Sequence, residues 1–160
     1  MSDEAKGLAR RFRAELEEIR AALHAVSASL ADSPWRAGGW TRKEILGHML
    51  DSAANNRHRF VGAAIDGRYE GSQYDQKPWV NAHGYADQEW ETLLRWWDVE
   101  HEILASVVDR IPEERLEAEC RMSEEPAVTL RFLIEDYVPH QRGHLEQIAS
   151  GAGIGASSAH

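Results

Sequence analysis

Apolar residues recur at steps of three and four over long stretches of this chain, and this spacing constrains the fold more than any other feature. Such a stripe is typical of one face of an amphipathic helix. The first stripe predicts a helix over residues 4–30, followed by a break at Pro34 and the paired glycines Gly38 and Gly39. Its members are Leu8, Phe12, Leu16, Ile19, Leu23, Val26 and Leu30.

Three further segments show the same period. The second helix should cover residues 41–65, because Thr41 and Glu44 form a capping box at its start. The third should cover residues 87–111 and the fourth residues 129–150. Four long amphipathic segments without an alternating strand pattern predict an all-α fold, a four-helix bundle.

The connections between these segments are of unequal length. Residues 66–86 show neither a helical nor a strand period, so we expect a long aromatic loop that packs over something and lets the chain cross the bundle. Residues 112–128 should hold a short turn at residues 113–116 and an extended piece near Cys120. We expect one domain over residues 1–151 and a disordered tail rich in Gly, Ala and Ser at the C-terminal end, residues 152–160.

Composition excludes several classes of protein. Hydrophobic residues make up 42% of the 160 residues, which is too many for a disordered chain. A net charge of −9 disfavours nucleic acids and anionic membrane surfaces as partners. A single cysteine, no apolar signal segment and no apolar run near the ~20 residues of a membrane span favour a cytoplasmic protein.

The most informative polar feature is the pair His140 and His144. Side chains four residues apart lie on one helix face, and this face is the apolar one that Leu133, Tyr137 and Ile148 continue. An imidazole that faces a core needs a partner for its ring nitrogens. Two of them at this spacing suggest a divalent metal ion.

A third inward-facing histidine, His48, lies near the start of the second helix. Three neutral imidazoles from two facing helices could bind nickel, zinc, iron or manganese and leave coordination positions open for a substrate. The alternative is structural, because single histidines on apolar helix faces are usually satisfied core or boundary residues. The spacing by itself leaves both interpretations open.

Polar residues extend from His48 along one side of the second helix, namely Asp51, Ser52, Asn55 and Arg59. Asp51 could accept the spare N–H of a metal-binding histidine or act as a base. For Asn55 and Arg59, an ordinary exposed helix face explains the pattern equally well.

Pro139 stands inside the fourth helix, immediately before His140. A proline there removes one hydrogen bond and crowds the carbonyl of Glu135, which costs about 3 kcal/mol. One interpretation is a kink that aims His140. The other is a tolerated kink without a purpose.

These residues resemble the DinB-like superfamily, and within it the YfiT-type proteins named metal-dependent hydrolases and also described as bacillithiol S-transferases. The similarity spans most of the chain from the second helix to the fourth. It is carried by residues 38–48 (GGWTRKEILGH), Asp51, Ser52, Asn55, Arg59, Phe60, residues 74–79 (YDQKPW) and residues 137–144 (YVPHQRGH).

The resemblance implies a four-helix bundle with a metal centre whose ligands are His48, His140 and His144. It also implies a homodimer. Activities in the group include metal-dependent transfer of low-molecular-weight thiols such as bacillithiol, mycothiol or glutathione to electrophiles. Pro139 departs from the family pattern.

Three functions follow as hypotheses. In the first, the metal lowers the pKa of a thiol cosubstrate, Asp51 or Tyr137 orients a ligand or moves a proton, and Tyr69, Tyr74 and Trp79 wall the pocket. In the second, the metal activates water for hydrolysis, with Asp51 as the general base. In the third, the bundle binds a metal or small molecule without turnover. For the aromatic residues, simple core packing is the alternative role.

The other histidines are interpreted as background. His24 and His101 should be boundary residues of the helices, whereas His58 and His83 should face solvent or lie in a loop. Cys120 is a poor candidate nucleophile, because the sequence places no histidine beside it.

Overall fold

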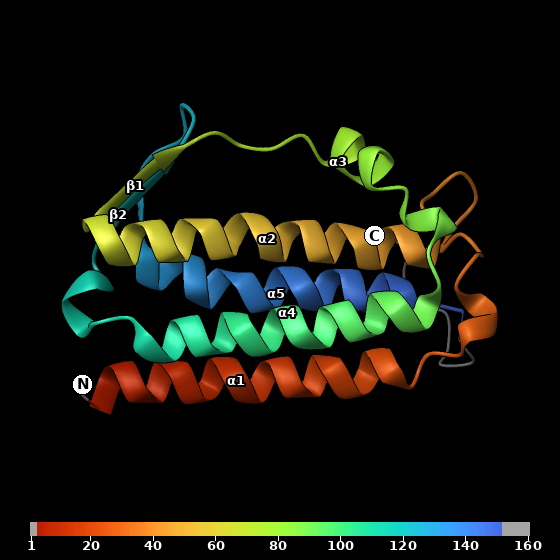
Figure 1. Ribbon diagram of the computed structural model, residues 1–160, viewed down its shortest axis with the longest axis horizontal. Helices are drawn as coiled ribbons and strands as arrows, with labels where there is room; N and C mark the ends of the chain where they lie inside the picture. Colours follow the sequence, from red (N-terminus) through yellow and green to blue (C-terminus); the bar gives the residue numbers. More distant parts are fainter. Residues whose placement is uncertain (1–2, 152–160) are drawn as a thin grey trace.

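The computed structural model describes residues 3–151 and contains four long helices that lie side by side (Figure 1). The predicted disordered tail lies outside the described residues. The predicted all-α four-helix bundle is confirmed. The long helices are α1 (Asp3–His24), α2 (Arg42–Asp66), α4 (Trp90–Arg110) and α5 (Leu130–Ala149).

In the bundle, α1 lies diagonally opposite α2, and α4 lies diagonally opposite α5. α2 packs mainly against α4 and α5, and α1 packs against the same two helices. Helices α2 and α4 run in the same direction in Figure 1, so the chain has to return along the bundle between them. With a rise of 1.5 Å per residue, the 25 residues of α2 span about 37 Å. A tight hairpin could not make this connection, which explains the long segment between the two helices.

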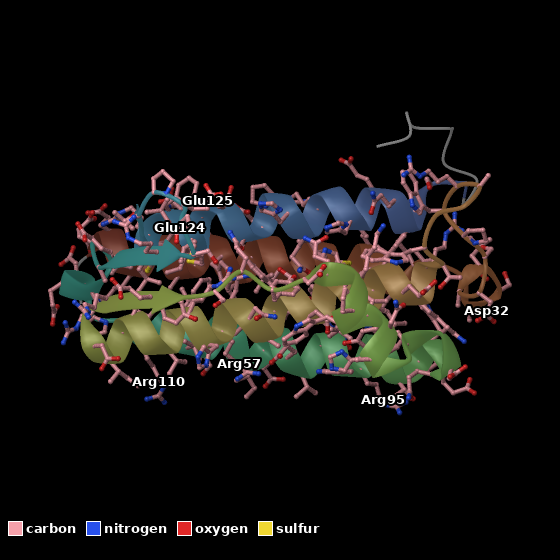
Figure 2. The ribbon with its side chains drawn as sticks, turned by 90° about the horizontal axis from the view of Figure 1, so that it is seen from above. Asp32, Arg57, Arg95, Arg110, Glu124 and Glu125 are labelled. Atoms are coloured by element: carbon pink, nitrogen blue, oxygen red, sulfur yellow. The ribbon has the colours of Figure 1, made fainter. Side chains whose placement is uncertain are left out.

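The segment of residues 66–86 is more regular than the sequence predicts. It contains strand β1 (Arg68–Gly71), helix α3 (Gln76–His83) and a 3-10 turn η2 (Tyr85–Asp87). The expectation of a loop without regular structure is therefore wrong. Short elements escape periodicity analysis, because four or eight residues hold too few repeats of a pattern. Seen from above, the segment runs lengthwise over the bundle (Figure 2).

A small sheet closes one end of this segment. β1 pairs in parallel with β2 (Glu119–Met122), with Tyr69 opposite Cys120, and β2 pairs antiparallel with β3 (Val128–Thr129). The extended piece predicted near Cys120 is thus confirmed as β2. The turn predicted before it is confirmed as the 3-10 turn η3 (Glu113–Arg115).

Helix ends follow local hydrogen bonding. The capping box of Thr41 and Glu44 is present in full. The first helix stops at His24 rather than at Leu30, because the Ser27 hydroxyl accepts a hydrogen bond from the Ser29 backbone and starts a separate 3-10 turn, η1 (Ala28–Leu30).

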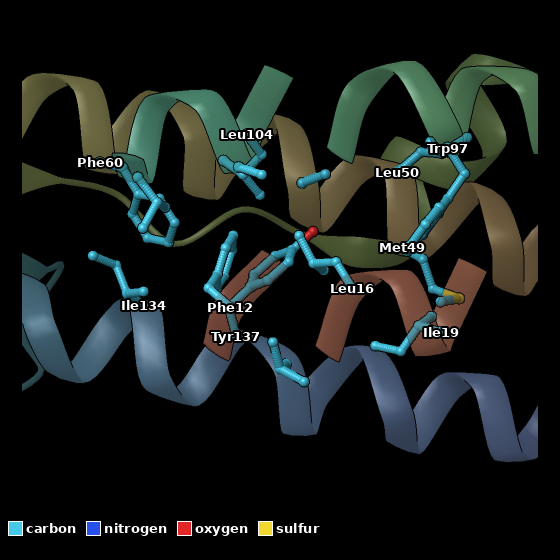
Figure 3. Close-up of a cluster of buried hydrophobic side chains, with 14 of the residues drawn as sticks. Phe12, Leu16, Ile19, Met49, Leu50, Phe60, Trp97, Leu104, Ile134 and Tyr137 are labelled. Carbon is cyan, nitrogen blue, oxygen red and sulfur yellow. The ribbon is translucent and has the colours of Figure 1, made fainter. Parts of the chain in front are cut away.

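The core lies between the four long helices, where Phe12, Leu16, Phe60, Leu104 and Ile134 pack together (Figure 3). The apolar stripes predicted from the sequence face this core. Within residues 3–151, no helix combines the length and the apolar character needed to cross a membrane.

α5 runs without interruption through Pro139, whose side chain is exposed. The proline ring therefore costs the helix a hydrogen bond without displacing a packed neighbour from the core.

Candidate metal centre and cavity

A cavity of about 480 Å³ lies against α2 and α5 beneath the segment that connects α2 to α4. All three histidines that the sequence singles out line it, His48 from α2 and His140 and His144 from α5. Tyr137 from α5 and Arg59 from α2 line it as well. The fold thus brings residues separated by about ninety positions in the chain to one wall.

His48 and His144 form the closest part of this arrangement. Their ring centroids lie 4.5 Å apart, and the rings meet edge to face. The His48 side chain is 3% exposed, and its Nδ1 atom is buried without a hydrogen-bond partner among residues 3–151. Burial, with the neighbouring His144 and His140, lowers the pKa of His48 to about 4. His48 is therefore neutral at pH 7, which is the form that binds metal ions.

The tautomer of His144 follows from its hydrogen bond. Its Nδ1 atom lies 2.9 Å from the side-chain oxygen Oε1 of Gln147. An amide oxygen can only accept, so Nδ1–H donates and Nε2 keeps a free lone pair. Burial also lowers the pKa of His144, which keeps the ring neutral.

His140 is placed differently from the prediction. Its side chain is 67% exposed, and its Nε2 atom lies 3.2 Å from the Asp136 carboxylate, one helical turn earlier. Across residues 3–151, no group of three His, Cys, Asp or Glu side chains is arranged closely enough to hold a metal ion. The rings of His48 and His144 are therefore adjacent, whereas His140 is exposed and pairs with the Asp136 carboxylate on its own helix.

Tyr137 belongs to a buried polar chain rather than to the histidine pair. Its hydroxyl lies 2.6 Å from Nε2 of His101, whose Nδ1 lies 2.8 Å from the Trp97 carbonyl oxygen. The carbonyl can only accept, so Nδ1–H donates to it and the Tyr137 hydroxyl donates to Nε2. Burial raises the pKa of Tyr137 well above its ordinary value, so the phenol stays protonated.

His101 is a fully buried residue, not the boundary residue that the sequence suggests. Trp97 stacks on it with a centroid distance of 3.8 Å and donates to the Gln141 side chain. Gln141 in turn donates to the Met49 carbonyl on α2. This network links α4, α5 and α2 behind the cavity. Only the spacing of Trp97 and His101, four residues apart, could have indicated it from the sequence.

The sequence suggests that Asp51 accepts the spare N–H of a metal-binding histidine, but its partners are Tyr85 and His83. Its Oδ1 atom accepts a hydrogen bond of 2.5 Å from the Tyr85 hydroxyl and lies 3.2 Å from Nδ1 of His83. Burial raises the pKa of Asp51, against the opposing effects of Tyr85 and His83. The carboxylate thus fastens α3 and the η2 turn to α2, and no hydrogen bond joins it to His48. Its assignment as a catalytic residue stays a prediction.

Of the three aromatic residues expected to wall the pocket, only Tyr74 lines the cavity. Trp79 packs against Tyr74 and His83 on α3. Tyr69 lies on the sheet and contacts His58. Trp79 and Tyr69 therefore pack against neighbouring aromatic rings and do not line the cavity.

Comparison with known proteins agrees with this fold. The family model described as the DinB superfamily matches residues 11–148. A protein of Oceanobacillus iheyensis named "Putative metal-dependent hydrolase" is 25% identical over 74% of this chain and 69% of its own length. "Putative metal-dependent hydrolase YfiT" of Bacillus subtilis is 34% identical over 40% of this chain and 38% of its own length.

Among solved structures, YfiT from Bacillus subtilis, described as having an unusual four-helix bundle topology, superposes with a TM-score of 0.78. The superposition covers 93% of this chain and 86% of that one at 20% sequence identity. At this level of identity the likeness concerns the fold.

Proposed function

This chain belongs to the DinB superfamily, and from that membership and the paired imidazoles we propose that it is a metal-dependent enzyme that acts on small molecules. The observation that carries the proposal is the buried Nδ1 atom of His48, which has no partner within residues 3–151, on a ring whose centroid lies 4.5 Å from that of His144. A buried polar atom without a hydrogen bond is costly, so such an atom at a cavity wall points to a ligand.

Imidazole nitrogens are donors that suit a divalent ion, and His48, His144 and His140 would hold it, although only the first two are adjacent in this structure. When bound, the ion supplies Lewis acidity and so lowers the pKa of a thiol or of water. His144 is already oriented for this role, since its Nδ1–H is held by Gln147. His140 would have to exchange Asp136 for the ion. Nickel, zinc, iron and manganese all accept imidazole ligands, and elemental analysis of the purified protein identifies which of them is bound.

For the reaction, we propose transfer of a low-molecular-weight thiol to an electrophile. Support comes from the position of the general base that hydrolysis would need. Asp51, the predicted base, does not line the cavity, and its Oδ1 atom is held by Tyr85 and His83. Asp136 in the cavity wall is paired with His140. A thiol whose pKa is lowered needs no such base at neutral pH. Hydrolysis is the second candidate, because the relatives from Oceanobacillus and Bacillus carry hydrolase names.

A turnover assay separates these candidates. Protein loaded in turn with each of the four metals is incubated with monochlorobimane or a chlorodinitrobenzene, with and without thiol, and with ester and amide substrates. We expect thiol-dependent conjugation that His144→Ala abolishes and that His58→Ala, at an exposed histidine, leaves unchanged. Ester or amide cleavage without thiol would favour hydrolysis. Bound metal without any turnover would show a binding protein instead.

A further inference from the structure

The second unusual polar group of the cavity is Arg59 on α2. It is 8% exposed, its Nη2 atom is buried without a hydrogen-bond partner, and within residues 3–151 it has no ion pair. An unpaired buried guanidinium is costly, because the charge loses its hydration without gaining a counter-charge. Arg59 lines the same cavity as the histidines.

Among residues 3–151, no carboxylate forms an ion pair with Arg59. Burial raises the pKa of the Tyr74 phenol and of the Cys120 thiol, and in both cases the positive charge of Arg59 opposes the rise, which places the guanidinium near these two groups. Neither is a carboxylate. Arg59 is also the only Lys or Arg among the described residues that line the cavity. Two carboxylates, Glu125 and Asp136, also line the cavity, but neither pairs with Arg59, so its positive charge is available to a ligand.

The separation of Arg59 from His48 along α2 sets the length of a ligand that contacts both residues. His48, Ser52, Asn56 and Arg59 all line the cavity and follow one another at steps of four, four and three, so they share one helix face. The Cα atoms of His48 and Arg59 are eleven residues apart, which is about 16 Å along a helix. The reach of the two side chains shortens this gap, but a single amino acid such as cysteine is too short to fill it.

We propose that Arg59 binds a carboxylate of the thiol cosubstrate, whose sulfur end lies at the histidines, so that this enzyme uses an acidic thiol of about tripeptide size. The identification of the ligand as a thiol rests on the proposed function, whereas the carboxylate site rests on Arg59 alone. A guanidinium matches the planar, singly charged carboxylate in a bidentate pair. A doubly charged phosphate would draw on more cationic groups than the single one here.

The test measures binding to protein freed of metal with a chelator, by calorimetry, with glutathione, glutathione diethyl ester and inorganic phosphate as probes. We expect glutathione to bind at least about tenfold more tightly than its ester, since a charge-assisted hydrogen bond is worth about 1.5 kcal/mol or more. Phosphate should not compete. Arg59→Met should reduce glutathione binding to the level of the ester and leave ester binding unchanged.

Arg57→Met is the matched control. Arg57 lies two residues away, pairs with Glu100 on α4 at 3.2 Å and does not line the cavity (Figure 2). This variant should bind glutathione like the wild type. Should Arg59→Met fail to fold, the comparison of acid and ester on the wild-type protein still decides the question.

Equal binding of glutathione and its ester to the wild type, no binding of glutathione, or tighter binding of phosphate would each overturn the carboxylate site. Because these measurements need no metal, they separate the two proposals. Selective carboxylate binding in a protein without metal-dependent turnover would leave the Arg59 site standing and overturn the proposed enzyme. Equal turnover with glutathione and its ester would overturn the Arg59 site alone.

Discussion

His101 shows how one buried side chain couples the core to the solution pH. Its ring is enclosed by α4 and α5, and burial lowers its pKa to about 4, although the bond to the Trp97 carbonyl opposes this. Protonation would also remove the acceptor at Nε2 that the Tyr137 hydroxyl needs. An imidazolium could only donate from Nε2, which would leave the proton of the buried Tyr137 hydroxyl without its acceptor, so the neutral ring is favoured.

Replacing His101 by Gln should therefore make stability less dependent on pH. Between pH 6.5 and 4 the unfolded chain binds a proton at this ring and the folded chain does not, so the free energy of unfolding is highest above pH 6.5 and falls as the pH approaches 4. The contribution of His101 to this fall is at most about 3 kcal/mol. Urea unfolding of the wild type and His101→Gln across this range measures it.

The control for this experiment is His58→Gln, at an exposed histidine of α2. Its pH profile should match that of the wild type. If His101→Gln lost stability toward pH 4 as steeply as the wild type, the buried neutral imidazole would not be a source of the acid sensitivity.

At the scale of elements, contact between α2 and the segment after β1 depends on a glycine. Gly47 lies under the ring of Tyr85, and a Cβ atom there would overlap the ring. This close approach lets the Tyr85 hydroxyl reach Asp51 one turn further along α2. The position of the η2 turn on α2 therefore depends on one small residue and one buried hydrogen bond.

Gly47→Ala should destabilise the protein by about 1–3 kcal/mol, because the forced displacement of Tyr85 outweighs the gain of about 1 kcal/mol in helix propensity. Thermal or urea unfolding measures the difference. Gly143→Ala on α5 is the matched control, since a Cβ atom at this position would have no neighbouring atom within 4 Å. It should stabilise the protein by about 0.5–1 kcal/mol. A stabilising Gly47→Ala would contradict the close packing of Tyr85.

At the scale of the whole molecule, the proposed ion would join α2 to α5 across the cavity. A ligand that binds only the folded state raises stability, by about 2.7 kcal/mol at a hundred times its dissociation constant. Removing the metal with a chelator should therefore lower the melting temperature by several degrees. In His144→Ala this difference should vanish. Equal melting curves with and without chelator in metal-loaded wild type would count against the metal centre.

The homodimer implied by the family resemblance remains a proposal, and α4 offers a surface for it. Val99 and Ile103 are 59% and 50% exposed and lie one turn apart on that helix. We expect the wild type to be a dimer by light scattering and the double change Val99→Glu with Ile103→Glu to be a monomer. Lys77→Glu, at an exposed residue of α3, is the control and should remain a dimer. A monomeric wild type would overturn the proposal.

Features that repeat along a helix could be predicted from the amino-acid sequence. The four long helices, the faces that form the core and the placement of His140 and His144 on one face follow from a local period of 3.6 residues. The cap at Thr41 follows from the residue types Thr and Glu three positions apart. Short elements such as β1 and α3 carry too few repeats to be found in this way.

Which of these helix faces meet could not be predicted from the sequence and follows from the packing of the helices. The 4.5 Å approach of His48 to His144, the attachment of Asp51 to Tyr85 and the burial of Arg59 each depend on residues far apart in the chain. The pairing of His140 with Asp136 depends instead on the rotation of an exposed side chain. A periodic pattern identifies the side of a helix that is buried, but the packing of helices determines which groups lie opposite it.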